Sequence, residues 1–163
     1  MDRTVLAALQ SEIPTIRRRW EALLRVEPVR SPLGNPDTLV YLISSSVETI
    51  LAALAKPRGR TLSLGAALRL PRGNCSCESN PYLPYFKSGE QAILETLVLI
   101  QAKLGALATR DADLAEFHAV FRAVSRREIE TFCGVCTCRG AGQGCRFGKK
   151  PPLARVVPAV PGT

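Results

Sequence analysis

The cysteines are the residues of this chain whose type and spacing could do chemistry. Four fall between residues 133 and 145 and two lie close together upstream. The six candidate ligands are Cys75, Cys77, Cys133, Cys136, Cys138 and Cys145. Glycines among the downstream group permit the positive-φ turns that let neighbouring sulfurs converge. Cys-x2-Cys spacing lets two thiolates bind one tetrahedral ion, and Cys-x-Cys can chelate or bridge ions. The pattern predicts a metal-binding loop.

Zinc is the ion we expect there, because it is the commonest ion of closed all-cysteine structural sites. The spacing matches no familiar zinc finger. It does not reproduce the ferredoxin spacings either, so an iron–sulfur cluster is an allowed alternative that the spacing does not indicate. Six thiolates could form one four-thiolate site with two spare sulfurs, or a two-metal cluster with bridging sulfurs. A redox thiol pair and incidental cysteines are the remaining interpretations.

The composition predicts a reducing environment for these thiols. Acidic and basic residues surround the short apolar run at the start of the chain, unlike a signal peptide. We also expect no stretch to approach the roughly 18 apolar residues of a membrane span. A cytoplasmic protein without a membrane partner is therefore predicted, and in that compartment clustered cysteines bind metals more often than they form disulfides.

The formal net charge is +8, from 22 Lys and Arg against 14 Asp and Glu. Such an excess suits a nucleic acid or another anionic partner. Arg139, Arg146, Lys149 and Lys150 flank the cysteines and are the candidate contacts. Four thiolates on a divalent ion would carry about −2, so part of this basic excess could compensate the site itself.

Apolar residues at intervals of three and four predict helices over residues 4–26, 36–56, 61–70, 88–108 and 111–132. The fold class is therefore all-α. We expect a single-domain antiparallel bundle of four main helices and one short one, with the cysteine-rich loop cluster at one end. Residues 1–148 form the domain, and residues 149–163 form a proline-rich flexible tail.

Local signals set the expected boundaries. Pro14 predicts a kink, or a second helix that starts near Glu12. Asn35-Pro36-Asp37 is a strong helix start, and Ser88-Gly89-Glu90-Gln91 matches a capping box. Residues 82–86 hold three aromatic rings and a proline, which we interpret as a cap on the core or the wall of a pocket rather than a helix interior.

The last two helices should bring the two cysteine groups together. At 1.5 Å per residue they are roughly 30 and 33 Å long, and the short connection makes them antiparallel neighbours. The chain should therefore reach Cys133 close to the place where it left Ser88, a dozen residues after Cys75 and Cys77.

Catalytic arrangements find little support in the sequence. His118 is the only histidine, and it lies roughly 20 Å along the helix from the cysteine end. We expect a surface or satisfied core histidine there. The acidic residues resemble helix caps and solvated faces, so an enzyme is the less favoured interpretation.

Residues 10–56 resemble the all-helical N-terminal sensor domains of RsbR-type bacterial stress regulators. The resemblance is carried by Arg19-Trp20-Glu21-Ala22-Leu23-Leu24, by Glu27-Pro28, and by Pro36-Asp37-Thr38-Leu39-Val40 before a long helix. It implies a globin-like helical architecture and a signalling role with a protein partner, and it transfers no site residue.

Three functions follow from these observations. The first is a non-enzymatic metal-binding helical protein that acts as a sensor or regulatory module. The second is a nucleic-acid-associated basic protein with a structural zinc loop. The third is an iron–sulfur electron carrier or redox subunit.

Overall fold

The structure of the protein is a computed structural model that describes residues 1–28, 34–56, 62–72, 80–106 and 108–138, with side chains to Val135. In these ranges it is all-α without strands, as predicted. The elements are α1 (Arg3–Ser11), α2 (Ile13–Val26), α3 (Pro36–Leu39), the 3-10 turn η2 (Val40–Leu42), α4 (Ile43–Ala55), α5 (Leu64–Leu68), α6 (Tyr82–Leu104) and α7 (Arg110–Cys138). The predicted tail and the four basic residues beyond α7 lie outside the described residues.

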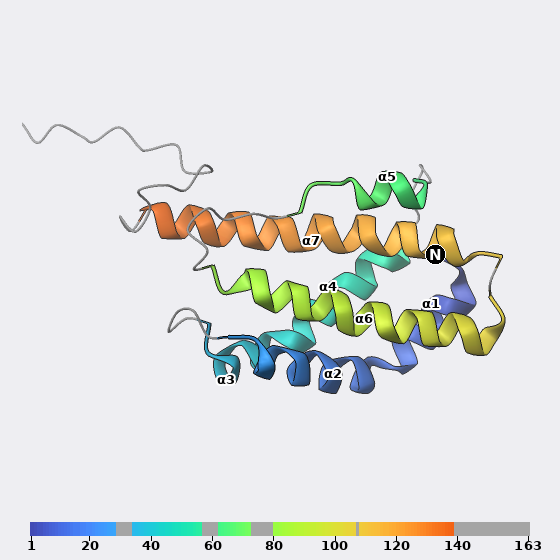
Figure 1. Ribbon diagram of the computed structural model, residues 1–163, viewed down its shortest axis with the longest axis horizontal. Helices are drawn as coiled ribbons and strands as arrows, with labels where there is room; N and C mark the ends of the chain where they lie inside the picture. Colours follow the sequence, from blue (N-terminus) through green and yellow to red (C-terminus); the bar gives the residue numbers. More distant parts are fainter. Residues whose placement is uncertain (29–33, 57–61, 73–79, 107, 139–163) are drawn as a thin grey trace, which may run out of the picture.

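Helices α6 and α7 form a long antiparallel hairpin, and the other helices pack around it (Figure 1). Helix α2 lies along α6 on the side away from α7. Helix α5 lies on the outer side of α7, and α4 crosses behind the hairpin to contact both α2 and α7. The start of α6, which follows Cys75 and Cys77 in the sequence, and the end of α7, which carries Cys133, therefore lie at the same end of the molecule.

The first predicted helix is two helices. Glu12 separates α1 from α2, and Pro14 occupies the first turn of α2. Proline is tolerated there because the first backbone N–H groups of a helix have no intrahelical acceptor. At the start of α1 the Asp2 carboxylate accepts hydrogen bonds from the amides of Thr4 and Val5 at 2.8 and 3.1 Å. This cap was not among the predicted helix starts.

The second predicted helix begins at the expected cap but is interrupted. Asn35 Oδ1 accepts from the Asp37 amide at 3.0 Å, after which η2 divides α3 from α4. Contrary to expectation, the stretch Pro36–Ala55 has the length and apolar composition needed to cross a membrane, with a mean hydropathy of 1.6. Core helices of folded proteins meet the same criterion. The predicted apolar stripe does face the core, and its members are Leu39, Ile43, Val47, Ile50 and Leu54.

Trp20 is the centre of the core. Its side chain is completely buried, and its Nε1–H donates to the carbonyl of Tyr85 at 2.9 Å. The rings of Tyr85 and Phe86 lie 4.9 and 6.4 Å from it, measured between centroids. The aromatic run therefore joins α2 to α6, which confirms that its rings pack into the core.

The boundaries predicted for α6 were wrong at both ends. The helix starts at Tyr82, so Pro84 falls in its first turn and Ser88 is a buried interior residue rather than a cap. It ends at Leu104, because Gly105 adopts a left-handed conformation with φ of 64° and its amide bonds back to Ala102. Leu104, the last residue of the helix, is exposed.

Candidate metal centre

Only part of the predicted cysteine site lies within the described residues. Cys133 is in α7 and is 1% exposed. Positions 136 and 138 belong to the backbone of α7 but their side chains are not described. Cys75, Cys77 and Cys145 lie outside the described residues. Among the residues that are described, no group of three His, Cys, Asp or Glu side chains could hold a metal ion.

The prediction that a loop begins at Cys133 was wrong, because α7 continues through Gly134 to Cys138. Ile129 and Cys133 are four residues apart and both are buried, so the apolar face of α7 extends past the predicted boundary. In a helix, positions 133 and 136 share a face, whereas position 138 lies about 140° around the axis from position 133. The Cys-x2-Cys pair is therefore the better matched pair of ligand positions.

Asn80 connects the start of α6 to the end of α7. Its Nδ2 donates to the Sγ of Cys133 at 3.3 Å and to the carbonyl of Ile129 at 3.2 Å, and its Oδ1 accepts from the amide of Tyr82 at 2.9 Å. The side chain is only 1% exposed. The rings of Tyr82 and Phe132 meet edge to face with centroids 5.5 Å apart. The chain that leaves the Cys75–Cys77 segment is thus bonded directly to the cysteine end of α7.

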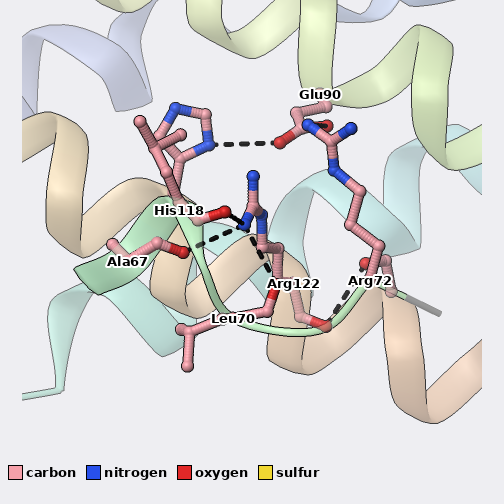
Figure 2. A network of polar contacts seen from close by, with 8 residues as sticks. Ala67, Leu70, Arg72, Glu90, His118 and Arg122 are labelled. Carbon is pink, nitrogen blue, oxygen red and sulfur yellow. Dashed lines mark hydrogen bonds and ion pairs between the residues drawn. The ribbon is translucent and has the colours of Figure 1, made fainter. Parts of the chain in front are cut away.

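Arg122 holds the chain that enters the same segment. Its Nη1 donates to the carbonyls of Ala67 and Leu70, each at 3.0 Å, and to that of Leu68 (Figure 2). The residue is 4% exposed. The last carbonyls of a helix lack intrahelical donors, and a short helix such as α5 depends on outside groups to satisfy them. Arg122 therefore fixes the end of α5 against α7.

Glu90, Arg72 and His118 surround this guanidinium group (Figure 2). His118 Nδ1 lies 3.1 Å from Glu90 Oε1, and it must be the donor because a carboxylate only accepts. Arg72 Nη2 lies 3.6 Å from the other carboxylate oxygen. His118 is 7% exposed, which confirms the prediction of a satisfied core histidine. The network ties α6 and α7 to the residues just before position 73.

The hydrogen bonds, charges and burial of this network shift the pKa values of Glu90 and Arg122. The hydrogen bond from His118 lowers the pKa of the Glu90 carboxyl despite its partial burial, and Arg72 lowers it further. Burial lowers the pKa of the Arg122 guanidinium, and the neighbouring charge of Arg72 acts in the same direction. The network therefore favours the charged form of Glu90, whereas burial opposes the charge of Arg122.

The roles of Asn80 and Arg122 were not predicted, and Glu90 was expected to be a helix cap or a solvated residue. One signal was available for Arg122. It follows His118 by four residues, so both occupy one face of α7, beside the face that carries Phe117 and Phe121. No local signal could have revealed Asn80, because its partners lie about fifty residues away along the chain.

The chain was compared with protein-family models, curated proteins and solved structures, and none of the three comparisons gave a significant match. The resemblance of residues 10–56 to bacterial sensor domains therefore stays a prediction.

Proposed function

We propose that this protein is a small non-enzymatic helical module that binds a metal ion through cysteine thiolates where α6 begins and α7 ends, and that it acts as a sensor or regulatory protein. Zinc is the proposed ion. The observation that carries the proposal is the 3.3 Å hydrogen bond between Asn80 and the sulfur of Cys133.

This contact matters because the covalent chain limits how far the upstream cysteines can be from Asn80. Consecutive Cα atoms are 3.8 Å apart, so the Cα atom of Cys77 lies within about 11 Å of that of Asn80, and that of Cys75 within about 19 Å. Cysteine ligands reach an ion over a Zn–S distance of about 2.3 Å plus the length of their own side chains. The length of the intervening chain therefore allows both upstream cysteines to reach a site beside Cys133.

A second contact restrains the other end of the segment that carries Cys75 and Cys77. Arg122 bonds to the carbonyl of Leu70, and Asn80 bonds to Ile129 and Cys133. Residues 122 and 133 are about 16 Å apart along the axis of α7. The segment that carries Cys75 and Cys77 thus has both ends attached to one helix, over a short distance, and this reduces the entropy lost when its thiolates bind an ion.

The chemistry of the described ligand position also fits a closed thiolate site. A metal-bound sulfur is commonly oriented by a hydrogen-bond donor behind it, and the Asn80 amide is placed to serve in this way. Thiolate ligation responds to oxidation, to proton concentration and to metal supply. An ion at this position would join the two halves of the α6–α7 hairpin, so its loss would be felt in the fold. This is the basis of the proposed sensing role.

The test is elemental analysis and visible spectroscopy of the full chain, purified without oxygen. We expect colourless protein with stoichiometric zinc. Cys136→Ser and Cys77→Ser should each lower the metal content and the melting temperature together. His118→Ala is the control: it should leave the metal content unchanged, although it removes the donor to Glu90 and so lowers stability modestly.

Each contrary outcome removes a defined part of the proposal. Protein that contains no metal refutes it, and brown protein that contains iron replaces zinc with an iron–sulfur cluster. Full metal content in both Cys75→Ser and Cys77→Ser would leave a site formed by the downstream cysteines alone. Full metal content and unchanged melting in Cys136→Ser would remove that residue as a ligand.

A further inference from the structure

A small pocket lies where α4, α6 and α7 meet, apart from the proposed metal site. Its volume is about 180 Å³. Its walls include the rings of Tyr82, Tyr85 and Phe86. This aromatic run was expected either to cap the core or to form the wall of a pocket. Pockets for drug-sized ligands measure about 300–1,000 Å³, so this one suits a molecule of only a few heavy atoms.

The helix α4 contributes hydroxyl groups to the pocket. Ser45, Ser46 and Thr49 all line it. The phenol of Tyr85 donates to Ser46 Oγ at 2.9 Å, and burial raises the pKa of Tyr85, so the phenol keeps its proton and stays a donor. Each hydroxyl oxygen has two lone pairs. Ser46 therefore retains one lone pair with which it can accept a hydrogen bond from a ligand.

Glu128 supplies a carboxylate to the same pocket. It is exposed, and within the described part of the chain it has no ion pair. Its neighbour Glu130, by contrast, pairs with Arg126 at 2.6 Å. Among the residues that the structure describes, no Lys or Arg lines the pocket, although the chain as a whole carries a formal charge of +8. The negative charge of Glu128 is thus available to a ligand.

A larger cavity of the molecule differs from this pocket in the charges of its lining. That cavity measures about 510 Å³ and includes Arg3 and Lys56 as well as Asp113 and Glu116, so it presents both signs of charge. The smaller pocket presents aromatic rings, hydroxyl oxygens, the aliphatic side chains of Leu42 and Val124, and one carboxylate. Aromatic faces and oxygen acceptors attract cations, and both favour a group with several N–H donors.

We propose that the pocket between α4, α6 and α7 binds a small organic ammonium ion, with its carbon body against Tyr82 and Phe86 and its nitrogen facing Glu128 and Ser46. The aromatic walls supply apolar contact and cation–π attraction. The carboxylate and the hydroxyl supply charge-assisted and neutral hydrogen bonds. An uncharged molecule of the same shape would gain only the apolar part of this stabilisation.

The test is a two-dimensional NMR titration of the full chain with methylammonium, butylammonium and benzylammonium, and with benzyl alcohol as the uncharged match. We expect at least one ammonium ion to bind saturably and to shift the resonances of Ser46, Tyr82 and Val124. Benzyl alcohol should bind at least about tenfold more weakly than benzylammonium, since a hydrogen bond to a charged group is worth at least that factor.

The variants sharpen the test. Glu128→Gln should weaken ammonium binding about tenfold. Glu130→Gln is the matched control on the same helix and should leave the affinity unchanged, because Glu130 does not line the pocket. Equal affinity for benzylammonium and benzyl alcohol, shifts confined to residues outside the pocket, or no saturable binding of any of the three ammonium ions would each overturn the proposal.

Discussion

Gly89 shows how strictly one residue can be determined by its neighbours. A Cβ atom placed on Gly89 would lie 2.2 Å from Trp20 Cζ2 and 2.5 Å from two further atoms of the indole ring. The ring has no room to move away, because Trp20 is fully buried and its Nε1 is bonded to the carbonyl of Tyr85. The absence of a side chain at position 89 is thus what lets α2 pack closely on α6.

Gly89→Ala should therefore destabilise the protein. Overpacking of a well-filled core costs about 1–3 kcal/mol, which exceeds the gain of up to about 1 kcal/mol from replacing a helical glycine by alanine. Gly65→Ala is the matched control, since a Cβ at Gly65 in α5 would meet no atom within 4 Å. Urea denaturation should show a lower free energy of unfolding for the first variant and no loss for the second. Equal effects of the two substitutions on the free energy of unfolding would mean that the indole ring of Trp20 moves to accommodate the added methyl group.

At the scale of elements, the Arg122 side chain of α7 supports the end of α5. Arg122 satisfies three carbonyls at the end of α5 and in the turn after it. Its Nε is buried and has no hydrogen-bond partner among the described residues, so the group is held at some cost in desolvation. Helix α5 itself has five residues, too few to be stable without tertiary contacts.

Arg122→Met should loosen α5 while the rest of the bundle stays folded. The amides of Ala67, Arg69 and Leu70 are bonded within this turn and report on it. Their hydrogen exchange should accelerate by at least about tenfold, the factor expected for loss of a charge-assisted hydrogen bond. Arg126→Met is the control, because Arg126 is partly exposed and its ion pair is with Glu130 on its own helix. Unchanged exchange in Arg122→Met would mean that apolar packing alone holds α5.

Helix faces could be predicted from the sequence, whereas several helix ends could not. The stripe from Leu39 to Leu54 was identified correctly because burial follows the helical period. The start of α6 was missed because a proline in the first turn loses no intrahelical hydrogen bond, and the burial of Tyr85 and Phe86 outweighs the local capping signal at Ser88.

The end of α7 was missed for a related reason. An exposed glycine in a helix costs about 1 kcal/mol, which made Gly134 look like a boundary. Buried Cys133 continues the apolar face set by Ile129, and this contact favours the helix over the predicted loop. Of the candidate site, the residue types and the shared end of the hairpin were predictable. The supporting side chains were not, because Asn80 and Arg122 act through partners that are distant in sequence.

At the scale of the whole molecule, the α6–α7 hairpin connects its open end to the core through a series of contacts. Tyr82 touches Phe132 at that end, and Tyr85, one turn further along α6, is bonded to both Trp20 and Ser46. An ion bound beside Cys133 would thus stabilise a region that is continuous with the core. Ligands that bind only the folded state stabilise it by about 2.7 kcal/mol at a hundred times their dissociation constant.

Removal of the metal with a chelator should therefore lower the melting temperature and expose one end of the molecule first. Hydrogen exchange should accelerate in the first turn of α6 and around Ile129 to Val135 in α7, because Asn80 couples these two segments. Exchange in α1, which packs on α6 and α4 away from the open end, is the internal control and should stay unchanged. Acceleration in α7 alone would contradict a shared centre, since only the downstream cysteines would then have held the ion. Uniform acceleration in all helices would mean that the ion supports global folding, and the local, reversible response on which a sensing role depends would be lost.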